Sequence, residues 1–102
     1  MTEPTPEELA RTKLNLETAR IAWRDLQRFF ASGAAIYVSE DLDLIEVAFQ
    51  FSEDNRQQFE QWMTAGQVAR VTDEQALVWY EANAMMWAVV VSPYVLVQPP
   101  RS

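Results

Sequence analysis

Residues 87–91, which read Trp-Ala-Val-Val-Val, limit the possible folds of this chain more than any other segment. Five consecutive apolar residues, three of them β-branched, are typical of a strand that is covered on both faces. Pro93 has no backbone N–H to donate, so it indicates a bulge or a sheet edge before residues 95–97 continue the strand. The sequence therefore predicts one strand over residues 86–97, central in a sheet or doubly covered.

A second pattern predicts a β-hairpin. Residues 35–39 are rich in strand-forming side chains, and residues 44–51 alternate between two faces. The side chains that share the apolar face of the second strand are Ile45, Val47, Phe49 and Phe51. Residues 40–43 then form the turn between the two strands.

Helix signals begin at Thr5, which can cap a helix that starts with Pro6 and is closed by Glu8 as a capping box. An apolar stripe at seven-residue spacing follows, formed by Leu9, Leu16, Trp23 and Phe30. The stripe fits one long helix, or two helices with a break between residues 17 and 22. Gly33 stands where a glycine ends such a helix.

Two further helices are predicted in the second half. Ser52 is expected to cap a helix that runs to residue 65 and ends at Gly66, with Phe59, Trp62 and Met63 on its core face. Residues 67–71 are extended. Thr72 and Gln75 form a second capping box that opens a helix carrying Ala76, Trp79 and Tyr80 on one face.

The resulting order of elements does not alternate strictly between strand and helix, which argues against a parallel doubly wound sheet. We predict an α+β fold in which helices pack on one face of a small, mainly antiparallel β-sheet. Residues 1–102 form a single domain, with an ordered core over about residues 6–98 and short polar tails. An apolar content of 49%, with 4 Trp, 5 Phe and 3 Tyr, is enough to form one hydrophobic core without disulfide bonds or structural metal ions.

The residue types that are missing exclude several classes of function. The chain has no cysteine and no histidine, so disulfides, thiolate metal sites and Ser-His-Asp or Cys-His catalytic arrangements cannot form within it. Two glycines do not make a phosphate-binding loop. The net charge of −7 argues against DNA as a partner. We expect no cofactor.

The acidic segment around Asp41, Asp43 and Glu46 is the candidate metal site, because Mg²⁺ and Ca²⁺ take several oxygen ligands. The segment lacks the glycine and spacing of an EF-hand loop. Acidic turns are usually solvated, since aspartate is an ordinary turn residue, so the same residues also fit a plain turn.

The candidate interface residues are Trp87, Tyr94, Arg24 and Arg28. With Arg20, the two arginines lie at i, i+4 and i+8, which places them on one helix face if residues 20–28 are helical. Such a row could bind an anion or an acidic partner, or it could be a solvated face with Glu17 and Asp25 as intrahelical partners. The tryptophans fit core packing, and Trp and Tyr are also enriched at interfaces.

Three segments, residues 26–33, 42–48 and 87–98, resemble a family of small bacterial proteins catalogued only as a domain of unknown function. The resemblance extends over about residues 13–98 and implies a bacterial, cytoplasmic protein with no assigned activity. The N-terminal residues lack the pattern of a signal peptide, and the longest apolar run, residues 84–91, is far shorter than the ~20 residues of a membrane span. We therefore expect a cytoplasmic protein with no membrane partner.

The leading functional hypothesis is a non-enzymatic interaction module that self-associates as a homo-oligomer or binds a protein partner. It rests on the strand with two apolar faces and on Tyr94 after it. Two alternatives stay open: a small carboxylate- or metal-dependent enzyme, and an RNA- or ribosome-associated factor acting through the arginines. The sequence identifies no small-molecule ligand.

Overall fold

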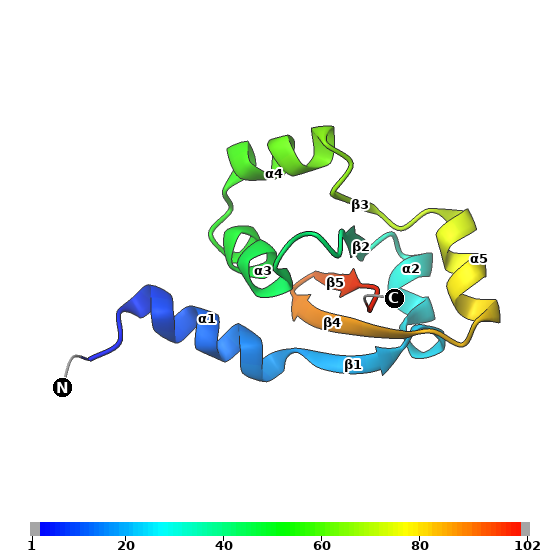
Figure 1. The fold of residues 1–102 in the computed structure, drawn as a ribbon, viewed down its shortest axis with the longest axis horizontal. Helices are drawn as coiled ribbons and strands as arrows, with labels where there is room; N and C mark the ends of the chain where they lie inside the picture. Colours follow the sequence, from blue (N-terminus) through cyan, green and yellow to red (C-terminus); the bar gives the residue numbers. More distant parts are fainter. Residues whose placement is uncertain (1–2, 101–102) are drawn as a thin grey trace.

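The structure, a computed structural model, describes residues 3–100, in which five strands form one open sheet flanked by helices (Figure 1). The strand order across the sheet is β1-β4-β5-β2-β3. Strands β2 and β5 run parallel, and the other three neighbouring pairs are antiparallel. This confirms an α+β fold with a mainly antiparallel sheet. The elements in chain order are α1 (Pro6–Glu17), β1 (Ala19–Ala22), the 3₁₀ turn η1 (Trp23–Leu26), α2 (Gln27–Ala31), β2 (Ala35–Val38), α3 (Leu44–Ser52), α4 (Arg56–Thr64), β3 (Val68–Arg70), α5 (Asp73–Glu81), β4 (Met85–Val91) and β5 (Tyr94–Gln98).

Helices cover both faces of the sheet, which corrects the expected one-sided packing. Alternation along each strand separates two cores. The α3 face of the sheet carries Ile36, Val38, Val89 and Leu96, and α1 and α3 pack on it. The α5 face carries Ala35, Met86, Val95 and Val97, and η1, α2 and α5 pack there. Two cores on one sheet need apolar residues on both sides of β4, as the run at residues 87–91 indicated.

The N-terminal third differs most from the expected helix or helix pair. Helix α1 has the predicted capping box but ends at Glu17, and the extended backbone of its C-cap, Thr18, leads directly into β1. Strand β1 pairs with β4, and only then do η1 and α2 follow. As a result the seven-residue stripe is divided: Trp23 is completely buried, whereas Leu9 and Leu16 are 56% and 79% exposed.

The predicted hairpin is wrong, because residues 44–52 form helix α3 rather than a strand. Leu44, Val47, Ala48 and Phe51 also follow the i, i+3, i+4, i+7 spacing of a helix. The side chain of Asp43 decides between the two patterns, since it accepts hydrogen bonds from the backbone N–H groups of Ile45 (2.9 Å) and Glu46 (3.4 Å) and so caps a helix.

The C-terminal segment is a β-hairpin instead of one interrupted strand. Residues 92–93 form the turn, and β5 runs back beside β4 with Val91 opposite Tyr94 and Trp87 opposite Gln98. The capping box at Thr72 is confirmed at the start of α5, whereas α4 is capped by Asn55 and not by Ser52. In the part of the chain that the structure describes, no helix has the length and apolar character needed to cross a bilayer.

Candidate functional site

An apolar groove of about 480 Å³ lies beneath α4 on the α3 face of the sheet. The end of α3 and the β4–β5 turn form one side of it, and α4 and the edge strand β3 form the other. Its main apolar side chains are Phe51, Phe59, Met63 and Tyr94. A mostly apolar concavity of this size is in the range of binding sites in proteins.

Aromatic contacts hold the groove in shape. The ring of Phe51 meets the ring of Phe59 at 4.2 Å and the ring of Tyr94 at 5.5 Å, both edge to face, and Phe59 also contacts Trp62 at 6.0 Å. None of the residues of α4 is fully buried. Trp62 packs against the core of the α3 face, whereas Phe59 and Met63 form the wall of an open groove.

The groove carries one positive charge, Arg70, that has no polar partner among the residues that the structure describes. Arg70 lies on β3 opposite Ile36, so it shares the α3 face, and its guanidinium makes no hydrogen bond or ion pair with any residue between 3 and 100. Asp54, just before the start of α4, contacts Arg56 at 3.9 Å. An apolar segment that brings an acidic group to Arg70 would match this arrangement.

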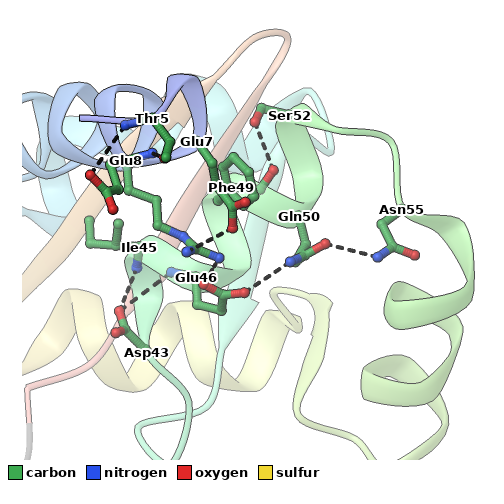
Figure 2. A network of polar contacts seen from close by, with 11 residues as sticks. Thr5, Glu7, Glu8, Asp43, Ile45, Glu46, Phe49, Gln50, Ser52 and Asn55 are labelled. Atoms are coloured by element: carbon green, nitrogen blue, oxygen red, sulfur yellow. Dashed lines mark hydrogen bonds and ion pairs between the residues drawn. The ribbon is translucent and has the colours of Figure 1, made fainter. Parts of the chain in front are cut away.

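A polar network fixes the position of α4 relative to α1 and α3 (Figure 2). Arg11 of α1 forms ion pairs with Glu7 (2.9 Å) and with Glu46 of α3 (2.8 Å). The amide of Gln50 donates to Glu46 at 2.9 Å, and Asn55 donates to Gln50 at 2.8 Å. The side-chain oxygen of Asn55 in turn caps α4. The groove wall is thus connected to α1 through four side chains.

The candidate metal residues are already engaged in local structure. Asp43 caps α3, and Glu46 pairs with Arg11 and accepts from Gln50. Asp41 is exposed in the loop, where its backbone N–H donates to Ser39. Between residues 3 and 100 no three His, Cys, Asp or Glu side chains are grouped so that they could hold a metal ion. Asp43 and Glu46 are therefore used within the chain, Asp43 as the cap of α3 and Glu46 as the ion-pair partner of Arg11.

The structure separates the four candidate interface residues. Tyr94 lines the groove. Trp87 lies on the same sheet face at the far end of the hairpin, where it is 41% exposed and the guanidinium of Arg20 stands 5.6 Å from its ring. Trp87 and Met85, which is 39% exposed, mark the end of β4 that the helices on this face leave uncovered.

The arginines do not form a row, because residues 20–28 pass through β1, η1 and α2 instead of one helix. The Nε of Arg24 donates to the carbonyl oxygen of Tyr80 at 3.0 Å and its guanidinium lies 4.7 Å from that ring, which ties η1 to the end of α5. Arg28 lies over Phe29 at 4.8 Å. Both cations are used in contacts within the chain.

Sequence reasoning missed most of the groove. Phe51, Phe59 and Met63 were assigned to core faces, and Arg70 was not considered. One signal was available for Met63: α4 is polar overall, with an apolar side of only three large residues, too few to cover a sheet. Nothing local to Arg70 indicates its position, because that depends on the pairing of β3 with β2.

Comparison with protein families gives the class of the chain. The model of a family described as "protein of unknown function (DUF2288)" matches residues 9–99. Because this match covers most of the 102 residues, the chain belongs to that family. The resemblance inferred from the three segments is thereby confirmed, and the family description assigns no activity.

A solved structure gives the particular relative. The chain is similar to the NMR solution structure of PA1075 from Pseudomonas aeruginosa, with 39% sequence identity and a TM-score of 0.81. The alignment covers 100% of this chain and 93% of the other. No curated protein matches the sequence. These comparisons support the fold and leave the function unknown.

Proposed function

We propose that the protein is a non-enzymatic, cytoplasmic interaction module that holds an apolar segment of a protein partner in the groove beneath α4. The observation that carries the proposal is the open aromatic groove with Arg70 in its wall, whose guanidinium pairs with no residue between 3 and 100. We further propose that the chain is one domain, because both cores share a single sheet, and that it is bacterial like its structural relative.

The chemistry of the groove favours binding over catalysis. An enzyme site needs acid–base or nucleophilic groups that converge on one point. The charged groups of the groove are Asp54, which precedes α4, and Arg70 on β3, which follows it, and they do not contact one another. A wall of Phe51, Phe59 and Met63 instead suits apolar side chains, as in domains that receive an amphipathic helix.

Site-specific photo-cross-linking tests this proposal. A photoreactive phenylalanine derivative replaces Met63, which lines the groove and is 59% exposed, in the full chain expressed in its native cells. The matched control places it at Gln57, which is exposed on α4 outside the groove. We expect a defined protein adduct from position 63 that is lost when Arg70→Glu is added, and none from position 57.

The absence of any protein adduct at position 63, or an equal adduct at position 57, would overturn the proposal. Either result would mean that the groove is not a site of specific protein contact.

A further inference from the structure

Helix α1 exposes apolar side chains on the side that faces away from the rest of the molecule. Leu9 and Leu16 are seven residues apart and therefore share one helix face. That face lies opposite the side on which Leu14 is buried and Arg11 contacts α3. We call Leu9, Thr12 and Leu16 the α1 stripe. Helix α1 thus packs on its own chain with one face and exposes apolar side chains on the opposite face, at the end of an elongated molecule (Figure 1). Such an exposed apolar face is suited to contact with a second protein molecule.

We propose, building on the function proposed above, that the α1 stripe of a second copy of this chain occupies the groove beneath α4. Both surfaces are apolar. The stripe presents the aliphatic side chains of Leu9 and Leu16, which lie about 10 Å apart along the helix. The groove offers aromatic rings and Met63 to receive them. The occupant of the groove is thus a helix that the chain itself supplies.

The charges around the two surfaces are complementary. By helical geometry, Glu8 flanks the stripe on one side and Lys13 flanks it on the other. The groove has Arg70 in the wall formed by β3 and Asp54 at the start of α4. Glu8 also closes the capping box with Thr5, Lys13 lies 4.0 Å from Glu17 and Asp54 lies 3.9 Å from Arg56. These side chains are exposed, so a docked helix can still bring Glu8 toward Arg70 and Lys13 toward Asp54, which favours one direction in the groove.

The stripe cannot enter the groove of its own chain. Arg11 is held to α3 by its ion pair with Glu46 at 2.8 Å and by its position 4.5 Å from the ring of Phe49. These contacts point the stripe away from α3, whereas the groove begins at the end of α3. Docking within one chain would break both contacts, so the groove must take the helix from another molecule.

Reciprocal docking of two copies would give a closed dimer. Each copy inserts its stripe into the groove of the other, which gives a two-fold dimer with two equal contacts and leaves no open end. The Arg11–Glu46–Gln50–Asn55 network holds the stripe and the wall of the groove in fixed positions before the copies meet, so little ordering is needed on association.

Sedimentation velocity of the full chain over a wide concentration range tests the proposal. The stripe variant is Leu9→Ser/Leu16→Ser, and the groove variant is Met63→Glu. The matched control is Leu77→Ser on α5, which is 58% exposed, much like Leu9, and belongs to neither surface. All of these positions are exposed, so each variant should keep its circular dichroism spectrum.

We expect the wild-type chain to form a dimer. Each test variant should raise the dimer dissociation constant at least about tenfold, because the burial lost exceeds the ~1.4 kcal/mol of a tenfold change. Leu77→Ser should leave the constant unchanged. A mixture of stripe and groove variants should form a heterodimer, because one of its two contacts joins an intact stripe to an intact groove.

A monomeric wild-type chain, an equal effect of Leu77→Ser, or a mixture that remains monomeric would overturn the inference. The cross-linking experiment separates this failure from failure of the proposed function. An adduct from position 63 with a different protein, together with a monomeric chain, keeps the groove as a binding site and rejects the second copy as its occupant. No adduct rejects both.

Discussion

The substitution Trp23→Phe gives the sharpest stability test of the structure. Trp23 is completely buried on the α5 face, and its indole N–H donates to the carbonyl oxygen of Ala76 at 3.0 Å. Its ring also packs edge to face against Trp79 at 5.1 Å and Phe30 at 5.8 Å. Phenylalanine keeps part of the ring packing but loses the hydrogen bond and leaves a space.

The expected cost is the sum of three terms. The buried hydrogen bond contributes about 1 kcal/mol. The smaller ring gives up roughly 1 kcal/mol of apolar burial, and a residual cavity of ~40 Å³ costs roughly another 1 kcal/mol. We therefore expect a loss of about 2–4 kcal/mol in the free energy of unfolding, which corresponds to a fall of about 8–30 °C in Tm.

Urea unfolding followed by circular dichroism measures this loss, provided that the m value is unchanged. The matched control is Trp87→Phe, the same replacement at a position that is 41% exposed. It should cost less than about 0.5 kcal/mol, because the smaller ring leaves no closed cavity. Equal losses for the two variants, or a larger loss for Trp87→Phe, would refute the assignment of Trp23 to the core and Trp87 to the surface.

Three other predictions follow from local structure. Thr72→Ala should lower the free energy of unfolding by about 1 kcal/mol in the same assay, since it removes the capping box of α5. Gly33→Ala should cost about 1 kcal/mol, because Gly33 has a φ of 77° and its new methyl group would meet only ordinary contacts; a cost near zero would contradict that backbone. Adding Mg²⁺ or Ca²⁺ after EDTA should leave Tm unchanged, because Asp43 and Glu46 are used as a cap and an ion-pair partner; a clear rise would restore the metal hypothesis.

The sequence predicted helix starts and ends correctly where a residue within one helical turn forms the hydrogen bonds of the terminal backbone groups, or supplies the positive φ, that the helix end needs. The two capping boxes at Thr5 and Thr72 begin α1 and α5 as predicted, and Gly33 follows the end of α2 with a positive φ. In each case a side chain or a glycine meets the needs of the nearest backbone groups, so no distant residue can change the result.

The secondary structure was predicted wrongly where one segment fits both a helix and a strand. Residues 44–51 satisfy both an alternating and a helical spacing, and the cap at Asp43 decided the outcome. Residues 19–22 continue the spacing of the helix before them, but pairing with β4 outweighs the local helix preference. Such pairing involves residues more than sixty positions away, so the local sequence could not show it.

The groove could not be predicted for the same reason. Tyr94 was proposed as an interface residue and does line it, but Phe51 reaches it only because residues 44–52 are helical. Arg70 reaches it only through the register of β3 with β2. A site assembled from α3, α4, β3 and the hairpin turn depends on the complete topology.

The methyl resonances of the methionines test the central claim, that copies of the chain meet at the groove, most directly. Met63 lines the groove, Met85 is exposed on the sheet outside it, and Met86 is completely buried. In a dilution series of the chain labelled with ¹³C at the methionine methyl groups, the Met63 resonance should shift with concentration while those of Met85 and Met86 stay fixed. A Met63 resonance that does not move, or a shift of Met85 in its place, would contradict the account.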